Sequence, residues 1–456
     1  MKMPNAREIS DEQQDIFEEA PLDGCILISG PPGTGKTVIA FMRAALISKK
    51  QVDVVVLMFN RVLKQYTANV ARQLGEYVTS NTMHSWFPDW WSKHKIVNEE
   101  YKFPLIDGNK FYLDCPYSEK DKLKQHGGKW FKYKSLSDKE TSGLWYVEKN
   151  QFESSLETYK EWCVSYRPLK IDTWKFDWEK MQDLYSELEE NQEIDWGHLI
   201  IDEGQDFEPG FYKFLHASGR QLNHGALTVL ADENQRLEEE RHSSLDEIKA
   251  ALRIAKKPER QFVLTKNFRN TAPIAKLAGH FYAGLQTGIP EYPEKLGVQP
   301  ILIQNINIEK QIEYISNILK LRGSLEVGVI IDDERDRKYF YDQLTEKLNN
   351  YEVQTYTSRE FKLSESLVFD KQGIVSVLNR KSCKGLEFDI VFVPQLQKMK
   401  VEDSNLTNFK MNMYVICSRA RTELIFMCDK GESGSPEVLN YFPSKSSNLI
   451  EYREQA

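Results

Sequence analysis

One glycine-rich octapeptide constrains the fold of this chain more than any other feature. It reads Gly30-Pro31-Pro32-Gly33-Thr34-Gly35-Lys36-Thr37. An apolar, strand-like run over Cys25–Ser29 precedes it, and a helical pattern over Val38–Ile47 follows. In this setting the glycines let backbone N–H groups turn inward around phosphates, and the N-terminus of the helix adds a favourable dipole. We therefore predict that the whole loop binds a nucleotide.

Two side chains of this loop are expected to contact the nucleotide and its metal ion. Lys36 should reach the β- and γ-phosphates, and the Thr37 hydroxyl should bind Mg²⁺. A second segment supplies acidic partners: His198-Leu199-Ile200-Ile201-Asp202-Glu203-Gly204-Gln205-Asp206. Its apolar residues place Asp202 at the carboxyl edge of a buried strand, near the loop, where it would complete the Mg²⁺ shell. Glu203 is positioned to activate the attacking water. The expected cofactors are ATP and Mg²⁺.

The strand-like runs recur at both ends of the chain and alternate with amphipathic helical stretches. This pattern is typical of α/β proteins with parallel sheets. The predicted strands are Cys25–Ser29, Val54–Phe59, Leu199–Asp202, Ala226–Leu230, Phe262–Thr265, Val327–Ile331, Ile374–Leu378, Ile390–Val393 and Leu424–Met427. Between Asp89 and Trp196 the rhythm stops, and helical pieces over Phe152–Tyr166 and Trp178–Glu190 suggest an insertion. Two α/β domains are expected to flank a hinge near Leu264–Arg269.

Composition excludes several other classes of protein. The 60 basic and 68 acidic residues give a net charge of −8, so any nucleic-acid binding must come from local basic surface. No apolar run approaches the roughly 18 residues of a membrane span, and the first residues contain no secretory core. The six cysteines form no CxxC pair, which argues against a disulfide scaffold and a zinc ribbon. We expect a soluble, cytoplasmic protein that does not associate with a membrane.

Glycine-rich loops of this kind occur in kinases, GTPases, AAA-type ATPases and helicases. The segments that choose among these classes are Ile9–Gln13, Phe59–Arg61, Thr82–Trp86, Asp202–Asp206, Ala231–Gln235, Asn267–Arg269, Lys384–Asp389 and Tyr414–Arg421. In this order they resemble the superfamily-one helicases, most closely the UvrD/Rep-like group. The resemblance covers most of the chain outside the insertion. It implies two RecA-like P-loop domains, the first over 1–90 and 195–265 and the second over 266–456, with a small α+β insertion over 91–194.

The resemblance also implies roles for single residues. Gln13 matches the glutamine that reads adenine, and Gln235 matches the glutamine that senses the γ-phosphate and couples it to the nucleic-acid groove. Arg269 and Arg419 match two arginines that reach the γ-phosphate from the second domain, so that catalysis depends on closure of the cleft. Glu387 matches a carboxylate near the ribose.

In similar proteins, five further positions lie in segments that line a single-strand track. They are Phe59, Asn60, Thr82, His84 and Trp86. Aromatic rings can stack on bases without reading sequence, and short polar groups can hold phosphates. For Phe59 a place in the core is an equal alternative, and His84 could equally cap or pack locally.

Two departures from the family pattern weaken the motor interpretation. After Gln235 the family carries an aromatic wedge, whereas this chain has Arg236-Leu237-Glu238-Glu239-Glu240. Only a few dozen residues separate the helical run Tyr339–Leu348 from the strand Ile374–Leu378, so the large insertion of the second domain is expected to be absent.

Part of the insertion, about Lys110–Glu148, resembles a small domain of uncharacterised function attached to primases and plasmid-transfer proteins. Its Trp130, Trp145 and Tyr146 could form a stacking surface beside lysines. The alternative is that these rings form the core of so small a domain.

The predicted function is an ATP-hydrolysing translocase or helicase on single-stranded nucleic acid. The resemblance favours DNA over RNA and 3′→5′ travel. The alternative is a nucleic-acid-sensing ATPase switch that recruits or licenses a protein partner, such as a nuclease, and unwinds little. A P-loop kinase is disfavoured by the two arginines expected on a second sheet.

Overall fold

The computed structural model describes residues 9–50, 53–59, 61–74, 77–94, 96, 106–134, 141–163, 168–169, 171, 175–187, 197–218, 226–235, 242–357, 364, 366–401, 406–430 and 436–454. The chain forms two compact units. The large unit comprises Met1–Met83 and Asp195–Ala456, and the small unit comprises His84–Ile194.

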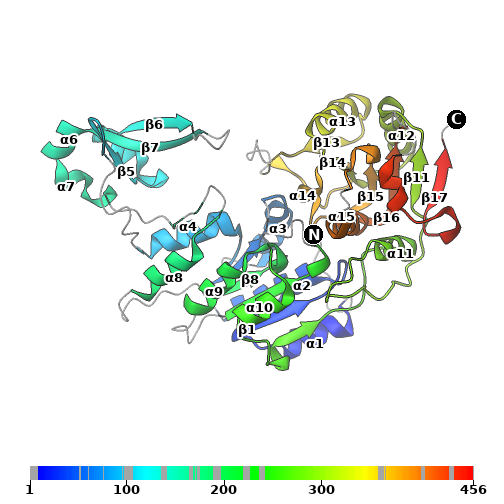
Figure 1. Cartoon of the computed structure of the whole chain (residues 1–456), viewed down its shortest axis with the longest axis horizontal. Coiled ribbons are helices and arrows are strands. Elements are labelled where there is room, and N and C mark those ends of the chain that lie inside the picture. The colour runs from blue at the N-terminus through cyan, green and yellow to red at the C-terminus, as the bar shows by residue number, and fades with distance from the viewer. Residues whose placement is uncertain are drawn as a thin grey trace. The chain divides into compact units, whose positions relative to one another are not determined.

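The first lobe of the large unit is built on a six-stranded sheet. Its order is β10 (Gln261–Val263), β1 (Gly24–Ser29), β9 (Ala226–Ala231), β8 (His198–Ile201), β2 (Val54–Met58) and β3 (Val78–Thr82), and every neighbouring pair is parallel. Its helices are α1 (Asp11–Glu19), α2 (Lys36–Ser48), α3 (Arg61–Leu74), α9 (Pro209–Ser218) and α10 (Leu245–Ala251) (Figure 1). The central strands β8 and β9 are buried along their whole length, as a sheet covered on both faces requires.

The second lobe has a seven-stranded sheet, again with every neighbouring pair parallel. Its order is β13 (Glu352–Thr355), β14 (Ile374–Leu378), β12 (Glu326–Ile330), β15 (Phe388–Val393), β16 (Ala420–Cys428), β11 (Ile301–Gln304) and β17 (Glu451–Glu454). Its helices are α11 (Ala272–His280), α12 (Ile308–Leu321), α13 (Glu334–Lys347), α14 (Arg380–Cys383) and α15 (Leu406–Cys417). The two parallel sheets confirm the predicted α/β class and have the character of RecA-like P-loop domains.

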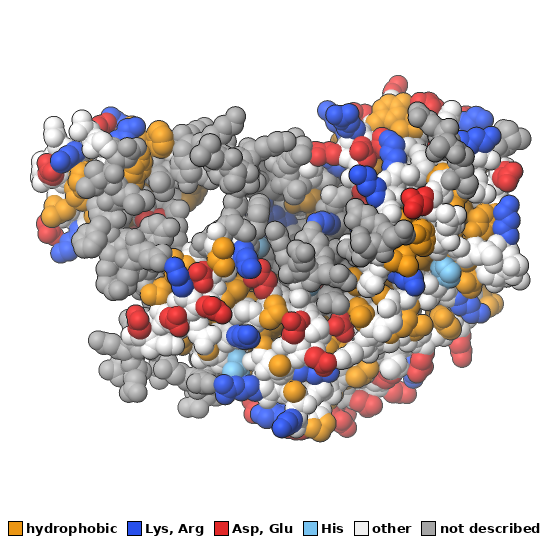
Figure 2. All heavy atoms as spheres, viewed as in Figure 1, with side chains coloured by type: hydrophobic (Ala, Val, Ile, Leu, Met, Phe, Trp, Pro, Cys, Tyr) orange, Lys and Arg blue, Asp and Glu red, His pale blue; other side chains and the backbone are white. Residues whose placement is uncertain are grey.

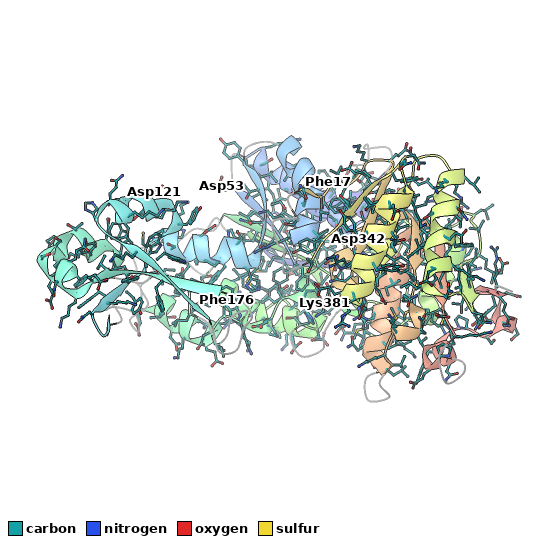
Figure 3. All side chains as sticks on the ribbon, turned by 90° about the horizontal axis from the view of Figure 1, so that it is seen from above. Phe17, Asp53, Asp121, Phe176, Asp342 and Lys381 are labelled. Carbon is teal, nitrogen blue, oxygen red and sulfur yellow. The ribbon has the colours of Figure 1, made fainter. Side chains whose placement is uncertain are left out.

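The two lobes share one hydrophobic cluster. It includes Ile39 and Leu63 from the first lobe together with Leu386 and Met413 from the second, all at most 1% exposed. In Figure 3, Asp53 beside β2 marks the first lobe and Asp342 on α13 marks the second. Since apolar burial joins them, groups on facing sides of the two lobes can be held within bonding distance.

The small unit contains an antiparallel sheet with the order β4 (Ile106–Asp107), β5 (Lys110–Leu113), β7 (Thr141–Glu148) and β6 (Lys129–Lys134). Short helices α5 (Lys120–Gln125), α6 (Lys149–Ser154) and α7 (Leu156–Tyr159) contribute Leu123, Phe152 and Tyr159 to the core on one face of it. Helices α4 (Met83–Lys93) and α8 (Trp178–Ser186) contribute to a second aromatic cluster, in which Phe87 contacts Trp91 and Trp178.

Several elements differ from the sequence predictions. The strands β3, β11, β13 and β17 were not predicted. The helix predicted over Phe152–Tyr166 is interrupted, because Ser155 leaves helical geometry at φ −140° and ψ 41° and separates α6 from α7. Trp145 is 7% exposed within the core of the small unit, which supports the core alternative for this ring. Among the described helices, none is both long and apolar enough to cross a membrane.

A buried arginine ties the N-terminal helix to the first sheet. Arg43 of α2 is 0% exposed. Its guanidinium donates to the carbonyl oxygens of Ala20 (3.2 Å) and Pro21 (2.7 Å) and to Thr228 Oγ1 (3.3 Å). The three bonds fix the α1–β1 connection against β9.

We expect Arg43→Met to lower the free energy of unfolding of the large unit by about 1–3 kcal/mol, because buried acceptors lose their donors. Urea denaturation followed by fluorescence measures this change. Lys371→Met, which removes an exposed ion pair with Glu352, is the matched control and should change stability by less than about 1 kcal/mol. Equal denaturation midpoints for both variants would contradict the assignment.

Candidate functional site

The glycine-rich loop runs from the end of β1 to the start of α2. Gly33 and Gly35 adopt left-handed φ values of 82° and 86°. A Cβ atom at Gly33 would lie 2.4 Å from Asn267 Oδ1, and one at Gly35 would lie 2.2 Å from Gln13 Nε2. Both positions therefore require glycine for backbone geometry and for space.

Lys36 begins α2 and folds back over the loop. Its Nζ donates to the carbonyl oxygens of Gly30 (2.6 Å) and Pro31 (3.0 Å). Thr34 Oγ1 also donates to the Pro31 carbonyl, at 2.9 Å. Burial lowers the pKa of Lys36, against the attraction of Asp232, Glu203 and Asp202. The ammonium of Lys36 is therefore desolvated, and carbonyl oxygens and nearby carboxylates compensate its charge.

Thr37 and Asp202 meet where β8 ends. Thr37 Oγ1 donates to Asp202 Oδ2 at 2.7 Å, and Asp202 Oδ1 accepts from the Glu203 N–H at 3.0 Å. Burial and the nearby Glu203 charge raise the pKa of Asp202 to about 6. Among the described residues, no group of three or more His, Cys, Asp or Glu side chains could hold a metal ion. A hydroxyl beside one buried carboxylate fits Mg²⁺, which takes few protein ligands and completes its shell with phosphate and water oxygens.

Glu203 has an unusual backbone. It adopts φ 53° and ψ 45°, in the left-handed region that is rare for a non-glycine residue. Gln205 Nε2 donates to Glu203 Oε2 at 2.6 Å, and Lys384 Nζ lies 3.6 Å from the same oxygen. Burial opposes ionisation, but the charges of Lys384, Lys36 and Arg419 outweigh it and lower the pKa of Glu203. The side chain is therefore an anion held in place, as a proton acceptor must be.

A chain of buried hydrogen bonds leads from Glu203 to the second lobe. Gln205 Oε1 accepts from the Asp232 N–H at 2.8 Å, and Asp232 Oδ2 accepts from Gln235 Nε2 at 2.6 Å. Gln235 Oε1 then accepts from Arg419 Nη2, also at 2.6 Å. Arg419 is 1% exposed, and burial together with Arg269 lowers its pKa to about 10.

Lys384 adds a second link between the lobes. Its Nζ donates to Asp206 Oδ2 and, at 2.5 Å, to the Gln235 carbonyl oxygen. Burial raises the pKa of Asp206 to about 7, although Lys384 opposes this shift. His242 Nδ1 lies 3.6 Å from the other oxygen of Asp206.

Glu387 organises the remaining charges. Its Oε2 accepts from Arg269 Nε at 2.6 Å, and its Oε1 accepts from Tyr66 Oη at 3.2 Å. Arg421 Nη2 lies 3.2 Å from Oε1. Burial opposes ionisation, but Arg269 and Arg421 bring the pKa of Glu387 down to about 2. The carboxylate therefore stays ionised across the ordinary pH range.

Gln13 lies in the first turn of α1, where it forms a capping box with Ser10. Its Nε2 donates to the Thr34 carbonyl oxygen at 2.9 Å, and its Oε1 accepts from the Ser10 N–H at 3.2 Å. A primary amide has two donors and two acceptor lone pairs, so one of each remains for a ligand.

An open pocket brings most of the predicted nucleotide residues together. It is lined by Gln13, Pro32, Gly33, Gly35, Lys36, Thr37, Glu203, Gln235, Arg269, Glu387 and Arg419. Gly30, Pro31, Thr34 and Asp202 do not line it. Gly30 and Pro31 accept from Lys36, and Asp202 accepts from Thr37, whereas Thr34 donates to Pro31. The roles assigned to these residues remain predictions.

Besides the lining residues Val38 and Gly385, sequence reasoning missed three residues of this site. Phe268 lines the pocket with a ring that is 50% exposed, and its N–H donates to the Gly33 carbonyl at 2.9 Å. Gln205 and Lys384 hold Glu203. All three lie inside motifs that were used for recognition, and position within a motif was the signal that could have found them.

The residues predicted for a single-strand track in the large unit are packed. Phe59 is half-buried, with its ring centroid 6.4 Å from Phe207 and 6.2 Å from His242. Lys384 Nζ lies 5.9 Å from the Phe59 ring. Thr82 ends β3 and is 7% exposed. Asn60 and the segment Arg236–Glu240 lie outside the described residues.

The two predicted track residues of the small unit differ in exposure. His84 is exposed and stacks on Phe176, with centroids 5.4 Å apart. Trp86 is 8% exposed and stacks on Trp90 at 5.9 Å, so a base could reach its ring only if this packing opened. The assignment of both to nucleic acid stays a prediction.

Comparison with known proteins gives a family. A model described as an AAA domain matches residues 13–240, which is half of the chain, and the chain belongs to this AAA domain family. Among solved structures, the chain is similar to the crystal structure of the C-terminal domain of a possible DNA helicase from Lactobacillus plantarum WCFS1. The identity is 16%, over 41% of this chain and 99% of that chain, with a TM-score of 0.30. No protein of curated function matches the chain.

We expect Lys384→Met to lower the free energy of unfolding by about 3 kcal/mol at pH 8, because it leaves Asp206 and Glu203 buried without their counter-ion. The loss should be smaller at pH 5.5. The pKa of Asp206 lies above that of an unfolded aspartate, so the folded state binds more protons and regains stability as the pH falls.

Chemical denaturation at the two pH values tests this expectation. Lys445→Met, whose exposed ammonium pairs with the exposed Glu454, is the control and should show little loss at either pH. An equal loss for Lys384→Met at both pH values would rule out the buried ion pair as the cause.

Proposed function

We propose that this protein is an ATP-dependent translocase or helicase on single-stranded nucleic acid, of the UvrD/Rep-like type. The observation that carries the proposal is the buried contact of Gln235 with Arg419, at 2.6 Å, beside the glycine-rich loop. This contact joins the edge of the first sheet at which its parallel strands end to an arginine of the second lobe. A kinase acting on a small substrate needs no such link.

The proposed reaction is hydrolysis of the γ-phosphoryl group. The oxygen of a water bonds to the γ-phosphorus, the bond to the bridging oxygen breaks, and Glu203 takes the proton from the water. Mg²⁺, held through Thr37 and Asp202, would neutralise charge on the β- and γ-oxygens. Lys36, Arg269 and Arg419 would stabilise the charge that develops on the transferring group.

Arginine pairing links this chemistry to motion. Arg269 donates a hydrogen bond to Glu387, and Arg419 donates one to Gln235. To meet a phosphate, both guanidiniums would exchange these partners for phosphate oxygens. Bound ATP would thereby draw the lobes together, and loss of the γ-phosphate would release them.

Two residues are proposed to recognise the base. The remaining donor and acceptor of Gln13 would pair with the edge of adenine, and the exposed ring of Phe268 would stack on its face. Glu387 would lie near the ribose.

Nucleic acid is proposed as the track, with DNA preferred over RNA and 3′→5′ travel. The first motor domain would comprise 1–90 and 195–265, the accessory domain 91–194, and the second motor domain 266–456. Among the coloured residues of the face in Figure 2, basic and acidic side chains are interspersed without forming one continuous basic patch. Binding would therefore depend on local contacts.

We expect Phe268→Ala to raise the Kd for ATP about tenfold while leaving the thermal unfolding midpoint unchanged, because a half-exposed ring is lost from the pocket alone. Titration with a fluorescent ATP analogue measures the affinity. Tyr339→Ala removes a ring of similar exposure from α13 and should not change the Kd. A Kd unchanged by Phe268→Ala would remove the stacking role.

The function itself is tested by steady-state ATPase activity with and without single-stranded DNA or RNA. We expect stimulation by one of them, and a loss of about 10²-fold or more in both Lys36→Ala and Arg419→Ala. Arg453→Ala, which breaks an exposed pair with Glu451, is the control for loss of an arginine. Turnover that ignores nucleic acid, in protein that still binds ATP, would overturn the motor proposal.

One observation favours the second candidate, a nucleic-acid-sensing switch that licenses a partner such as a nuclease. Between α13 and β14 the second lobe carries β13 and no further helix or strand of four or more residues among the described residues, so the lobe is compact. Strand displacement by the lone chain separates the two candidates: a motor displaces the strand, and a switch hydrolyses ATP without doing so.

A further inference from the structure

The sheet of the small unit has two faces of different chemistry. On β5, Phe111 and Leu113 are 7% and 1% exposed, and on β7, Trp145 and Val147 are 7% and 0% exposed. All four belong to a core that also contains Leu123 of α5. This face of the sheet is covered by helices, and Asp121 on the same α5 is labelled in Figure 3.

Side chains alternate along a strand, so the intervening residues lie on the opposite, outer face. Tyr112 of β5 is paired with Tyr146 of β7, and Phe131 of β6 lies one strand further. All three rings are half-buried. They form a triangle with centroid distances of 6.1, 6.3 and 6.4 Å.

The three rings do not stack on one another. Their interplanar angles are 59°, 58° and 84°. On the covered face, by contrast, Phe111 and Phe152 lie 4.2 Å apart at 12° and use their flat sides on each other. The rings of the outer triad therefore meet one another at steep angles, and none lies flat on another.

A lysine lies over two of the three rings. Lys110 Nζ lies 4.6 Å from the centroid of Phe131 and 5.0 Å from that of Tyr146. No carboxylate of the described residues is within ion-pair distance of it, and Glu148, its neighbour across the strands, pairs with Lys129 instead at 3.3 Å. An ammonium held over rings without a carboxylate can bind an anion at no cost in broken ion pairs.

The sequence around Lys110 carries a net positive charge, which is complementary to the charge of phosphate. From Lys110 to Glu140 there are eight lysines and five acidic residues, in a chain whose net charge is −8. This segment is thus a stretch of net positive charge in an acidic protein. Lys120, Lys122 and Lys124 lie on α5, which covers the other face of the sheet, so the positive charge argued for the outer face is that of Lys110.

We propose that the outer face of this sheet, formed by Tyr112, Phe131, Tyr146 and Lys110, is a binding site for single-stranded nucleic acid. Bases would stack on the rings, and Lys110 would contact a backbone phosphate. A duplex keeps its bases stacked inside, so only a single strand can offer them to a flat face. The site needs no ATP and shares no residue with the pocket of the large unit.

The test is carried out with the full chain in the absence of nucleotide. An oligothymidylate and an oligouridylate that carry 5-iodouracil are photo-crosslinked to the protein, and the linked peptides are identified by mass spectrometry. We expect crosslinks at Tyr112, Phe131 or Tyr146. The double variant Tyr112→Ala/Tyr146→Ala should raise the Kd for the preferred oligonucleotide about tenfold in fluorescence anisotropy.

The chain offers a matched control. Tyr117 is 80% exposed, and Lys120 Nζ lies 3.6 Å from its centroid, so it is also a tyrosine with a lysine above it, but it is a single ring outside the sheet. Tyr117→Ala should leave the Kd unchanged. Lys110→Gln tests the phosphate contact without removing a ring, and should raise the Kd and flatten its salt dependence.

Crosslinks found only in the large unit would overturn the proposal, and so would an unchanged Kd for both Lys110→Gln and a folded double variant. If the double variant does not fold, the crosslinked peptides of the wild type and the Lys110→Gln affinity still decide. Nucleic-acid stimulation of the ATPase is measured separately, so failure of this site and failure of the motor proposal are distinguishable.

Discussion

The large unit depends on a buried polar connection between its lobes. Glu203, Gln205, Asp232, Gln235 and Arg419 are linked in that order, with hydrogen bonds of 2.6 to 2.8 Å. Buried polar groups are costly unless they are satisfied, so each of these residues needs a partner in place of any that it loses. We propose this connection as the route by which a change at the nucleotide pocket reaches the second lobe. Lys384 strengthens the connection, because its ammonium joins Asp206 to the Gln235 carbonyl.

A second network fixes the other side of the pocket. The Glu387 carboxylate accepts hydrogen bonds from Arg269 and Tyr66 and forms an ion pair with Arg421. Tyr66 belongs to α3 of the first lobe. The two networks share a property: each pairs an arginine proposed for phosphate with a polar group of the protein. Charge that would otherwise be buried alone is thus satisfied, and a phosphate would compete with these partners instead of filling an empty space. This competition is the physical basis proposed for coupling ATP to movement of the lobes.

Much of the site could be predicted because it depends on local order along the chain. A strand, a glycine-rich turn and a helix follow one another, so Lys36 and Thr37 could be assigned directly, and the apolar run before Asp202 placed it at a strand end. Pairings between distant segments carry no such signal. Lys384 reaches Asp206 across 178 positions of sequence, and the left-handed backbone of Glu203 is set by the turn that follows β8.

The strand β3 escaped prediction because its sequence, Val-Thr-Ser-Asn-Thr, is polar and forms a sheet edge. Trp145 and Trp130 look alike in sequence and pair across β7 and β6 on the same face of the sheet. Trp145 lies on an internal strand and is 7% exposed, whereas Trp130 lies on the edge strand and is 47% exposed.

Hydrogen exchange with and without MgADP and aluminium fluoride, a mimic of the transferring phosphoryl group, tests most directly whether both lobes build one ATP site. If they do, the mimic slows amide exchange in both lobes. The affected peptides of the first lobe are Gly30–Thr37 and Glu203–Asp206, and those of the second are Lys384–Phe388 and Tyr414–Arg421. Protection confined to the first lobe would contradict a shared site, and the arginines of the second lobe would then have no part in hydrolysis.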